Sequence, residues 1–307
     1  MDFRMNKLLK KMMVALLSLG LAQAVLADDV SDFKKTLQVA EQGNTKAQFS
    51  LGKMYYEGQG VRQDYVEAAR WYLKAAEQGY PAAQNNLGAM YAKGQGVHQD
   101  YAQAMMWYRK AAEQGAAAAQ YNLGLLYAND SSLHQDYVQA EKWYRKAAEQ
   151  GYPAAQNNLG AMYAKGQGVR QDYAQAMEWY RKSAKQGYAP AQNNLGVMYD
   201  EGKGVRQDYA QASGWFLKAA EQGVATAQFN LGIMYETGRG VRQDSAQAAQ
   251  WFRKAAEQGD AYAQHNLALM HVNGQGVPQN YKIAKEWLGK ACANESQRSC
   301  YAYHIVD

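Results

Sequence analysis

The chain has 307 residues and a formal charge of +5 at pH 7, with 33 Lys and Arg against 28 Asp and Glu. Glycine and tyrosine are abundant while proline is scarce, a composition that a repetitive chain explains better than one compact core does. No basic stripe with interleaved aromatic residues is present, so we expect no nucleic-acid partner.

The first 27 residues have the layout of a secretory signal peptide. Three lysines (Lys7, Lys10 and Lys11) precede an apolar run over 12–21, and small residues lead to a cleavage site after Ala27. The run is too short to span a bilayer, although an uncleaved membrane anchor is the alternative. Removal of this segment lowers the formal charge to +2, from 29 cationic and 27 anionic residues. We therefore predict a periplasmic or secreted protein with no integral membrane segment after cleavage.

A period of 36 residues runs through the rest of the chain. The stretch AEQGYPAAQNNLGAMYAKGQGV at 76–97 returns unchanged at 148–169. The seven tryptophans follow the same step, at Trp71, Trp107, Trp143, Trp179, Trp215, Trp251 and Trp287. Such self-similarity is typical of a solenoid, in which each unit buries apolar surface against its neighbours. We interpret the tryptophans as core residues, with a ligand-stacking row as the alternative.

Each unit reads as two helices, and the second unit shows the pattern. In helix A, Leu87 and Met90 fall on one helical face, and Gly88 leaves room for another helix to approach. The turn GQGV follows, in which Gly94 and Gly96 supply the positive φ angles that end a helix.

Helix B is predicted to start at a capping box. Asp100 caps the helix and Gln103 completes the box three residues on, so the helix begins at Tyr101, and Gly115 ends it. Its inward face consists of Ala104, Trp107, Tyr108 and Ala111. The pair recurs as Asp64/Glu67, Asp136/Gln139, Asp172/Gln175, Asp208/Gln211 and Asp244/Gln247.

The domain boundaries follow from this period. After the signal peptide (1–27), residues 28–43 match a lone helix B. Seven full units occupy 44–295, and residues 296–307 match the start of an eighth helix A. The two half units are expected to cover the apolar ends of the stack.

These residues resemble the Sel1-like repeat, a 36-residue relative of the tetratricopeptide unit. The match in the second unit consists of Ala83, Leu87, Gly88, Tyr91, Gly94, Gly96, Val97, Asp100, Ala104, Trp107, Tyr108, Lys110, Ala111 and Ala112. The resemblance implies an all-α fold, an α/α right-handed superhelical solenoid, and a role as an adaptor or scaffold for other proteins. The last unit departs from the pattern at Ala268, His271 and Asn280, and the third unit lacks the Gly-x-Gly turn at 130–132. That turn reads either as a looser corner or as a ligand-specific loop.

The two cysteines have the spacing found in the secreted cysteine-rich Sel1-type proteins of Gram-negative bacteria, a resemblance that implies a disulfide between Cys292 and Cys300. On one straight helix they would lie about 12 Å apart, so a turn must separate them. The repeat supplies that turn, because Cys292 aligns with the end of helix B and Cys300 with the next helix A. Two free thiols are the alternative.

Signals of catalysis are weak. Ser31/Lys34 and Ser50/Lys53 have the Ser-x-x-Lys spacing, and some cysteine-rich relatives are associated with β-lactam binding, but no Ser-Asp-Asn or Lys-Thr-Gly accompanies them. The histidines do not cluster with cysteines or carboxylates at metal-ligand spacing, and the Gly-x-Gly turns follow no strand. We therefore predict a protein that is not an enzyme, with no catalytic residue, no metal site and no cofactor.

The outer face of helix A is the candidate binding surface. One of its positions carries Asn86, Asn122, Asn158, Asn194, Asn230 and Asn266. The position before it varies, and its aromatic members are Phe49, Tyr121 and Phe229. A row of amides can hold an extended peptide by its backbone while the variable neighbours select side chains. The alternative is that each amide bonds to the next unit and specifies stacking.

We interpret the chain as a monomeric, non-catalytic scaffold or adaptor of the cell envelope that binds a protein or peptide on its concave helix A face. Asp200, Glu201 and Glu236 make part of this face acidic, which favours a cationic partner segment. Two other functions remain open. One is weak binding or hydrolysis of β-lactams or peptidoglycan fragments, and the other is a purely structural role in the envelope.

Overall fold

The computed structural model describes residues 28–129, 135–294 and 296–305, and the regular structure within them is helical. The predicted signal peptide and the 130–132 turn lie outside these residues. Two compact units make up the chain, one ending at Trp143 and the other beginning at Tyr144. None of the described helices is both long and apolar enough to cross a bilayer.

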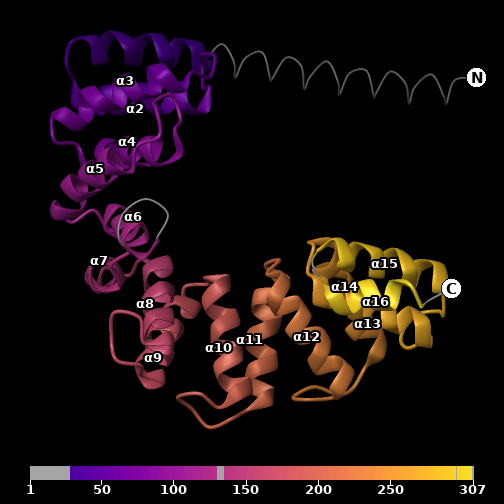
Figure 1. The fold of residues 1–307 in the computed structure, drawn as a ribbon. Helices are drawn as coiled ribbons and strands as arrows, with labels where there is room; N and C mark the ends of the chain where they lie inside the picture. The colour runs from indigo at the N-terminus through magenta and orange to yellow at the C-terminus, as the bar shows by residue number, and fades with distance from the viewer. Residues whose placement is uncertain (1–27, 130–134, 295, 306–307) are drawn as a thin grey trace, which may run out of the picture. The chain divides into compact units, whose positions relative to one another are not determined.

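Each repeat is a helical hairpin, and the hairpins follow one another in chain order (Figure 1). Residues 28–41 form one helix before them, and α16 (Gln297–Tyr303) follows them. The A helices are α2 (Thr45–Glu57), α4 (Pro81–Lys93), α6 (Ala117–Ala128), α8 (Pro153–Lys165), α10 (Ala189–Glu201), α12 (Ala225–Thr237) and α14 (Ala261–Asn273). The B helices are α3 (Tyr65–Glu77), α5 (Tyr101–Glu113), α7 (Tyr137–Glu149), α9 (Tyr173–Lys185), α11 (Tyr209–Glu221), α13 (Ser245–Glu257) and α15 (Tyr281–Ala293).

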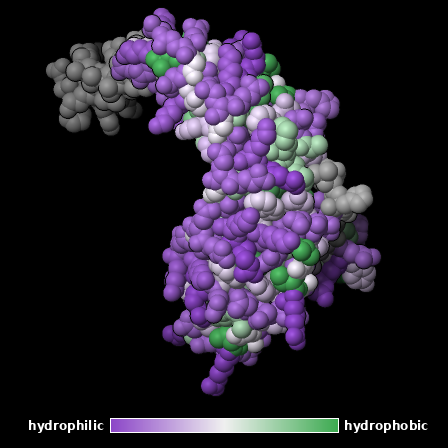
Figure 2. Space-filling view, turned by 90° about the vertical axis from the view of Figure 1, so that its left-hand side faces the viewer, coloured by the Kyte–Doolittle hydropathy of each residue, from purple (hydrophilic) through white to green (hydrophobic). Residues whose placement is uncertain are grey.

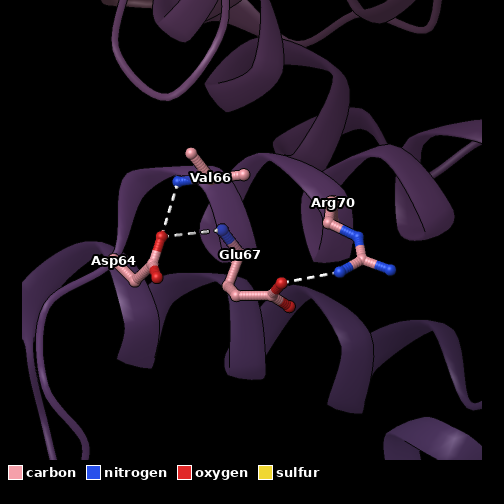
Figure 3. A network of polar contacts seen from close by, with 4 residues as sticks. All are labelled: Asp64, Val66, Glu67 and Arg70. Carbon is pink, nitrogen blue, oxygen red and sulfur yellow. Dashed lines mark hydrogen bonds and ion pairs between the residues drawn. The ribbon is translucent and has the colours of Figure 1, made fainter.

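The B helices start at the predicted aspartates, but the predicted capping box forms only in part. At α3, one carboxylate oxygen of Asp64 accepts hydrogen bonds from the backbone N–H groups of Val66 (2.9 Å) and Glu67 (3.1 Å) (Figure 3). The Glu67 side chain does not return to the cap, because the N–H of Asp64 already donates to the carbonyl of Tyr55. Glu67 instead pairs with Arg70 at 2.6 Å. The aspartate alone therefore supplies the cap.

Two glycines of the A–B turn have different tasks. Gly94 ends α4 in the left-handed conformation, with φ of 67°, and its N–H donates to Met90. Gly96 also has a positive φ, 69°, and a side chain there would collide with the backbone carbonyl of Tyr65 in the preceding repeat. The first glycine ends the helix, and the second lets two repeats approach closely.

The core lies between successive hairpins, as the period predicts. Trp107 of α5 is 6% exposed and packs with Leu87 and Met90 of its own hairpin and with Tyr72 of the preceding one. The ammonium group of Lys110 lies 4.4 Å from the Trp107 ring centroid, a cation–π contact that recurs along the chain. The structure therefore places this tryptophan in the core, and the same holds for Trp71, Trp179 and Trp251.

A row of buried glutamines joins successive repeats, and the sequence analysis did not foresee it. Gln84 of α4 donates to the carbonyl of Ala76 at the end of α3 in the preceding repeat (3.0 Å) and accepts from Gln114 at the end of α5 in its own repeat (2.8 Å). We call this arrangement the glutamine relay. Its buried members are Gln48, Gln84, Gln120, Gln156, Gln192, Gln228 and Gln264. Since each buried amide is hydrogen-bonded, the relay fixes how one hairpin sits on the next.

Replacing Gln228 by methionine, which is similar in shape, is expected to lower the unfolding free energy by about 1–2 kcal/mol. The change removes the bonds to the Ala220 carbonyl (3.0 Å) and from Gln258 (2.8 Å) inside the core. Gln258→Met is the control, because it leaves the Ala220 bond intact and alters an exposed side chain that otherwise makes only a long bond to the Lys254 carbonyl (3.5 Å). Urea unfolding of both variants checks the prediction, and an equal loss in the two would contradict it.

The C-terminal end is closed by α16. Tyr303 and Ala302 of this helix pack against Ala268 and Leu288 of the last hairpin. Cys292 and Cys300 are paired across the turn between α15 and α16, with their Cα atoms 4.6 Å apart. The N-cap residue of α15 is Asn280 instead of aspartate. The cap still forms, because the Asn280 side chain accepts a hydrogen bond from the N–H of Ile283 at 3.0 Å.

The double variant Cys292→Ser/Cys300→Ser is expected to lower the stability of the C-terminal hairpin by about 2 kcal/mol, the chain-entropy contribution of so short a loop. Amide hydrogen exchange in α15 and α16 measures the change. A reductant should bring the wild-type exchange to the level of the variant and leave the variant unaffected. Equal exchange in the two proteins without reductant, together with free thiols in non-reducing mass mapping, would show that no disulfide forms.

The surface displayed in Figure 2 is mainly hydrophilic, and the hydrophobic residues on it form small separate patches. The most exposed large apolar side chains of the described residues include Tyr262 and Tyr301, each 74% exposed. Among the described residues, no large apolar patch is therefore visible on the face shown in Figure 2.

Candidate functional site

The helix A face consists of Asn85, Asn86, Ala89, Ala92 and Lys93 of the second repeat and the residues that follow them at steps of 36. The structure places all six predicted asparagines on this face in half-buried positions. Their hydrogen bonds differ, however, and divide them into two groups.

In the first group the amides join neighbouring repeats. Asn122 of α6 donates to the side-chain oxygen of Asn85 of α4 at 2.9 Å, and Asn85 donates to Asn86 at 3.4 Å. The second copy of the 22-residue stretch behaves in the same way. Asn194 donates to Asn157 at 2.9 Å and Asn157 donates to Asn158 at 3.2 Å. The bonds of Asn122 and Asn194 are the contacts that the stacking alternative predicts.

The bridge is missing one repeat later. Asn193 occupies the position of Asn85 and Asn157, but its side-chain oxygen is buried without a hydrogen-bond partner. Its expected donor, Asn230, lines a cavity instead. In the first repeat the bridge cannot form, because Phe49 stands at the position that Asn85, Asn157 and Asn193 hold in other repeats. Asn86 then lines a cavity too.

Cavity one lies between α2, α3 and α4 and has a volume of about 320 Å³. Its walls are mainly aromatic and apolar, and the Phe49 and Tyr72 ring centroids are 5.7 Å apart. Burial is the main reason that the pKa of Tyr72 is raised to about 12, so its hydroxyl stays neutral and able to donate. The lining consists of Phe49, Lys53, Tyr56, Glu57, Tyr72, Asn86, Ala89 and Met90.

Cavity two lies between α10, α11 and α12 and is smaller, about 110 Å³. One carboxylate oxygen of Asp200 is buried there without a hydrogen-bond partner. Burial also raises the pKa of Glu236, which holds the same repeat position as Asp200. The lining consists of Val197, Asp200, Glu201, Phe216, Asn230, Ile233, Met234 and Arg239.

The two cavities occupy the same place in the repeat. Asn86, Tyr72 and Met90 of cavity one correspond to Asn230, Phe216 and Met234 of cavity two. Sequence reasoning named the two asparagines but missed the aromatic residue of helix B, which it assigned wholly to the core. The available signal was the repeat position that Lys53 and Val197 occupy, because the residue type at this position changes from one repeat to the next.

The remaining predicted residues lie apart from any common centre. Phe229 packs between the rings of Phe252 (5.9 Å) and Tyr262 (6.0 Å), and Tyr121 is half-buried on α6. Ser31, Lys34, Ser50 and Lys53 are exposed, and Lys53 pairs with Glu57 at 3.8 Å. Within the described ranges, no three His, Cys, Asp or Glu residues are grouped so as to hold a metal ion.

Tandem helical hairpins that bury their cores against each other, with a shared surface on the A helices, define an α/α solenoid of the helical-repeat class. The chain belongs to the Sel1 repeat family, whose model matches residues 45–80, 81–115, 117–152, 153–188, 189–224, 225–260 and 261–296. The family name predicted from the motif is therefore confirmed, and so is the all-α solenoid fold. Sel1 repeat proteins generally act as protein-interaction scaffolds.

Solved structures agree with this assignment. The chain is 39% identical to c5321, a protective antigen of uropathogenic Escherichia coli strains with an SLR fold, over 88% of this chain and 58% of that one, with a TM-score of 0.80. It is 38% identical to a Sel1 repeat protein of Oxalobacter formigenes, over 90% of this chain and 80% of that one, with a TM-score of 0.75. The chain thus spans little more than half of the first of these proteins.

A more distant likeness concerns the fold alone. Yeast Tom70 is 13% identical and aligns over 92% of this chain and 58% of its own length, with a TM-score of 0.52. No curated protein sequence matches this chain.

Proposed function

We propose that the protein is a non-catalytic scaffold or adaptor of the cell envelope that binds a protein or peptide on the helix A face. The observation that carries the proposal is the pair of equivalent cavities on this face, one in each compact unit. They open where the amide bridge between repeats is absent, so Asn86 and Asn230 line them with polar groups that a peptide backbone can use.

The envelope location is supported by the signal-peptide pattern of residues 1–27 and by the paired Cys292 and Cys300 near the C-terminus. Disulfides persist in oxidising compartments such as the periplasm. We propose that the protein acts there as a monomer, which light scattering of the processed protein would measure.

The chemistry of cavity two supports a cationic segment in the partner. Asp200 keeps a buried oxygen without a donor although Arg239 also lines the cavity, and Glu201, which pairs with Lys203 at 2.8 Å, adds a second carboxylate. A lysine or arginine of the partner would supply the missing donor and would be guided by the charge.

The test compares two matched pairs of substitutions on the same face. Asn86→Ala/Asn230→Ala removes the amides that line the cavities, and Asn122→Ala/Asn194→Ala removes those that bridge repeats. A partner is first captured from envelope extract, identified and purified, and its Kd for each variant is then measured by calorimetry. We expect the first pair to weaken binding about tenfold or more, with a smaller loss of melting temperature than in the second pair. The second pair should lower the melting temperature and change the Kd little.

The opposite pattern, with binding lost only in the bridging pair, would contradict the assignment of these amides. Failure to capture any partner, in an extract that supplies ligands to a control protein, would favour the structural envelope role.

The absence of catalysis is part of the proposal and is tested separately. The Ser50 hydroxyl and the Lys53 ammonium group are both exposed, and Lys53 pairs with Glu57, so neither has the buried setting that activates a nucleophile. Pure protein should not hydrolyse nitrocefin. Turnover that Ser31→Ala or Ser50→Ala abolishes would establish the β-lactam alternative.

A further inference from the structure

We propose that cavity one is an anchor site for one aromatic side chain with an N–H or O–H donor, tryptophan or tyrosine, from an extended segment of the partner. This inference rests on the proposed function and adds the chemistry of the residue recognised. Its basis is the set of rings, the size of the cavity and the one carboxylate at its edge.

The rings that wall the cavity are held in place by other rings. Phe49 lies 5.7 Å from Tyr72 and 5.1 Å from Tyr80, and Tyr56 lies 5.1 Å from Tyr65 in an edge-to-face arrangement. A guest ring would therefore meet preformed faces and edges and would require little ordering of the host. The Met90 sulfur at the base is polarizable and favours aromatic over aliphatic contact.

The size of the cavity fits one large side chain. Its volume of about 320 Å³ is at the lower end of the range for sites that bury a small organic ligand. Cavity two, at about 110 Å³ and lined by two carboxylates and an arginine, suits a narrower polar group. The two cavities therefore select different side chains, although they share one repeat position.

The polar edge of cavity one selects a donor. The Glu57 carboxylate and the Lys53 ammonium group form a long ion pair at 3.8 Å. The Glu57 side chain is 47% exposed and the Lys53 side chain is 56% exposed. Such an exposed, long pair contributes little, so the Glu57 carboxylate is free to accept a hydrogen bond from an indole N–H or a phenol O–H. Asn86 also lines the cavity and is hydrogen-bonded to Tyr72, so the backbone of the same segment would meet a polar pair there.

The test uses the full chain and the peptide Ac-Ala-Ala-X-Ala-Ala-NH2, in which X is 5-fluorotryptophan, followed by fluorine NMR. Unlabelled peptides with Trp, Tyr, Phe, Leu or Ala at X compete with this probe. We expect Trp and Tyr to displace it about tenfold more effectively than Leu does, and Ala not to displace it. Equal displacement by Leu would overturn the inference.

Two substitutions make the result specific to cavity one. Ala89→Phe fills the cavity from α4 and should weaken probe binding about tenfold or more. Ala161→Phe places the same side chain at the same position in the second copy of the 22-residue stretch, and should leave binding unchanged. Glu57→Gln, on an exposed side chain, should raise the Kd of the probe and the inhibition constants of the Trp and Tyr peptides, each calculated with the probe Kd of that variant, but not the inhibition constant of the Phe peptide.

Each outcome decides between the two proposals. Undiminished binding to Ala89→Phe, or an equal loss in Ala161→Phe, refutes the anchor site. If Ala89→Phe loses helix content, Glu57→Gln gives the decision instead. Should the wild-type protein bind its purified envelope partner but not the probe, the anchor site fails and the scaffold function stands. If it binds neither, both fail.

Discussion

Replacing Gly232 by alanine is expected to lower the unfolding free energy by about 3 kcal/mol, the upper end of the cost of overpacking a core. A methyl group there would lie 2.6 Å from two ring carbons of Phe252. Phe252 is fully buried between hairpins and has no space into which to move. Urea unfolding monitored by circular dichroism measures the loss.

The last repeat supplies the control for this prediction. There the glycine is replaced by Ala268, and the aromatic ring is replaced by Leu288. Adding Phe252→Leu to Gly232→Ala should therefore recover about 1–2 kcal/mol of the loss as a coupling energy. Gly214→Ala is the second control, since a methyl group meets nothing within 4 Å there and alanine favours the helix. If the loss in the double variant equalled the sum of the losses in Gly232→Ala and Phe252→Leu alone, the steric explanation would be refuted.

Replacing Gly96 by alanine is expected to cost more than about 3 kcal/mol, because two penalties combine. The residue has φ of 69°, and its new methyl group would strike the backbone carbonyl of Tyr65 in α3. Backbone cannot rotate aside as a side chain can, so the hairpins would have to separate. A lower melting temperature and faster amide exchange at the N-termini of α3 and α5 are the measurements.

Gly115→Ala isolates the conformational part of this cost. Gly115 also has a positive φ, 89°, but a methyl group there meets nothing within 4 Å. Its loss should be about 1–2 kcal/mol, the cost of a left-handed non-glycine residue. If Gly96→Ala cost no more than Gly115→Ala, close approach of the repeats would not be the reason for the second glycine.

Much of the fold was predictable because each hairpin is specified locally. The start of α5 at Tyr101 follows from Asp100, and the end of α4 follows from Gly94. These signals recur every 36 residues and do not depend on distant contacts. The capping box was predicted too fully, since the N–H of the cap residue found a partner in the preceding helix.

The glutamine relay could not be predicted in the same way. Gln84 reads as a polar residue of an amphipathic helix, and only the packed hairpins show that it is 3% exposed and bonded at both ends. A glutamine kept at one position of every repeat was the available signal. Its meaning required the geometry of the joint between repeats.

Only part of the candidate site could be predicted from the sequence, because the hydrogen bonds of its asparagines depend on how the repeats pack. The sequence predicted one row of asparagines on the helix A face, but not which of them bridge repeats, since Asn230 makes no bridge although Asn193 precedes it. Phe49 leaves Asn86 without a bridge, whereas Asn85 engages Asn122. A single row of identical residues therefore contains two kinds of site.

Because the relay bonds recur with the same chemistry at successive joints, a hairpin can be excised or inserted without creating a new kind of contact. Gln84 donates to the carbonyl of Ala76 in the preceding repeat as Gln156 donates to that of Ala148, at 3.0 Å in both cases. The identical stretches at 76–97 and 148–169 show that whole repeats are interchangeable in sequence as well as in contacts. A chain shortened or lengthened by whole 36-residue repeats should therefore still fold.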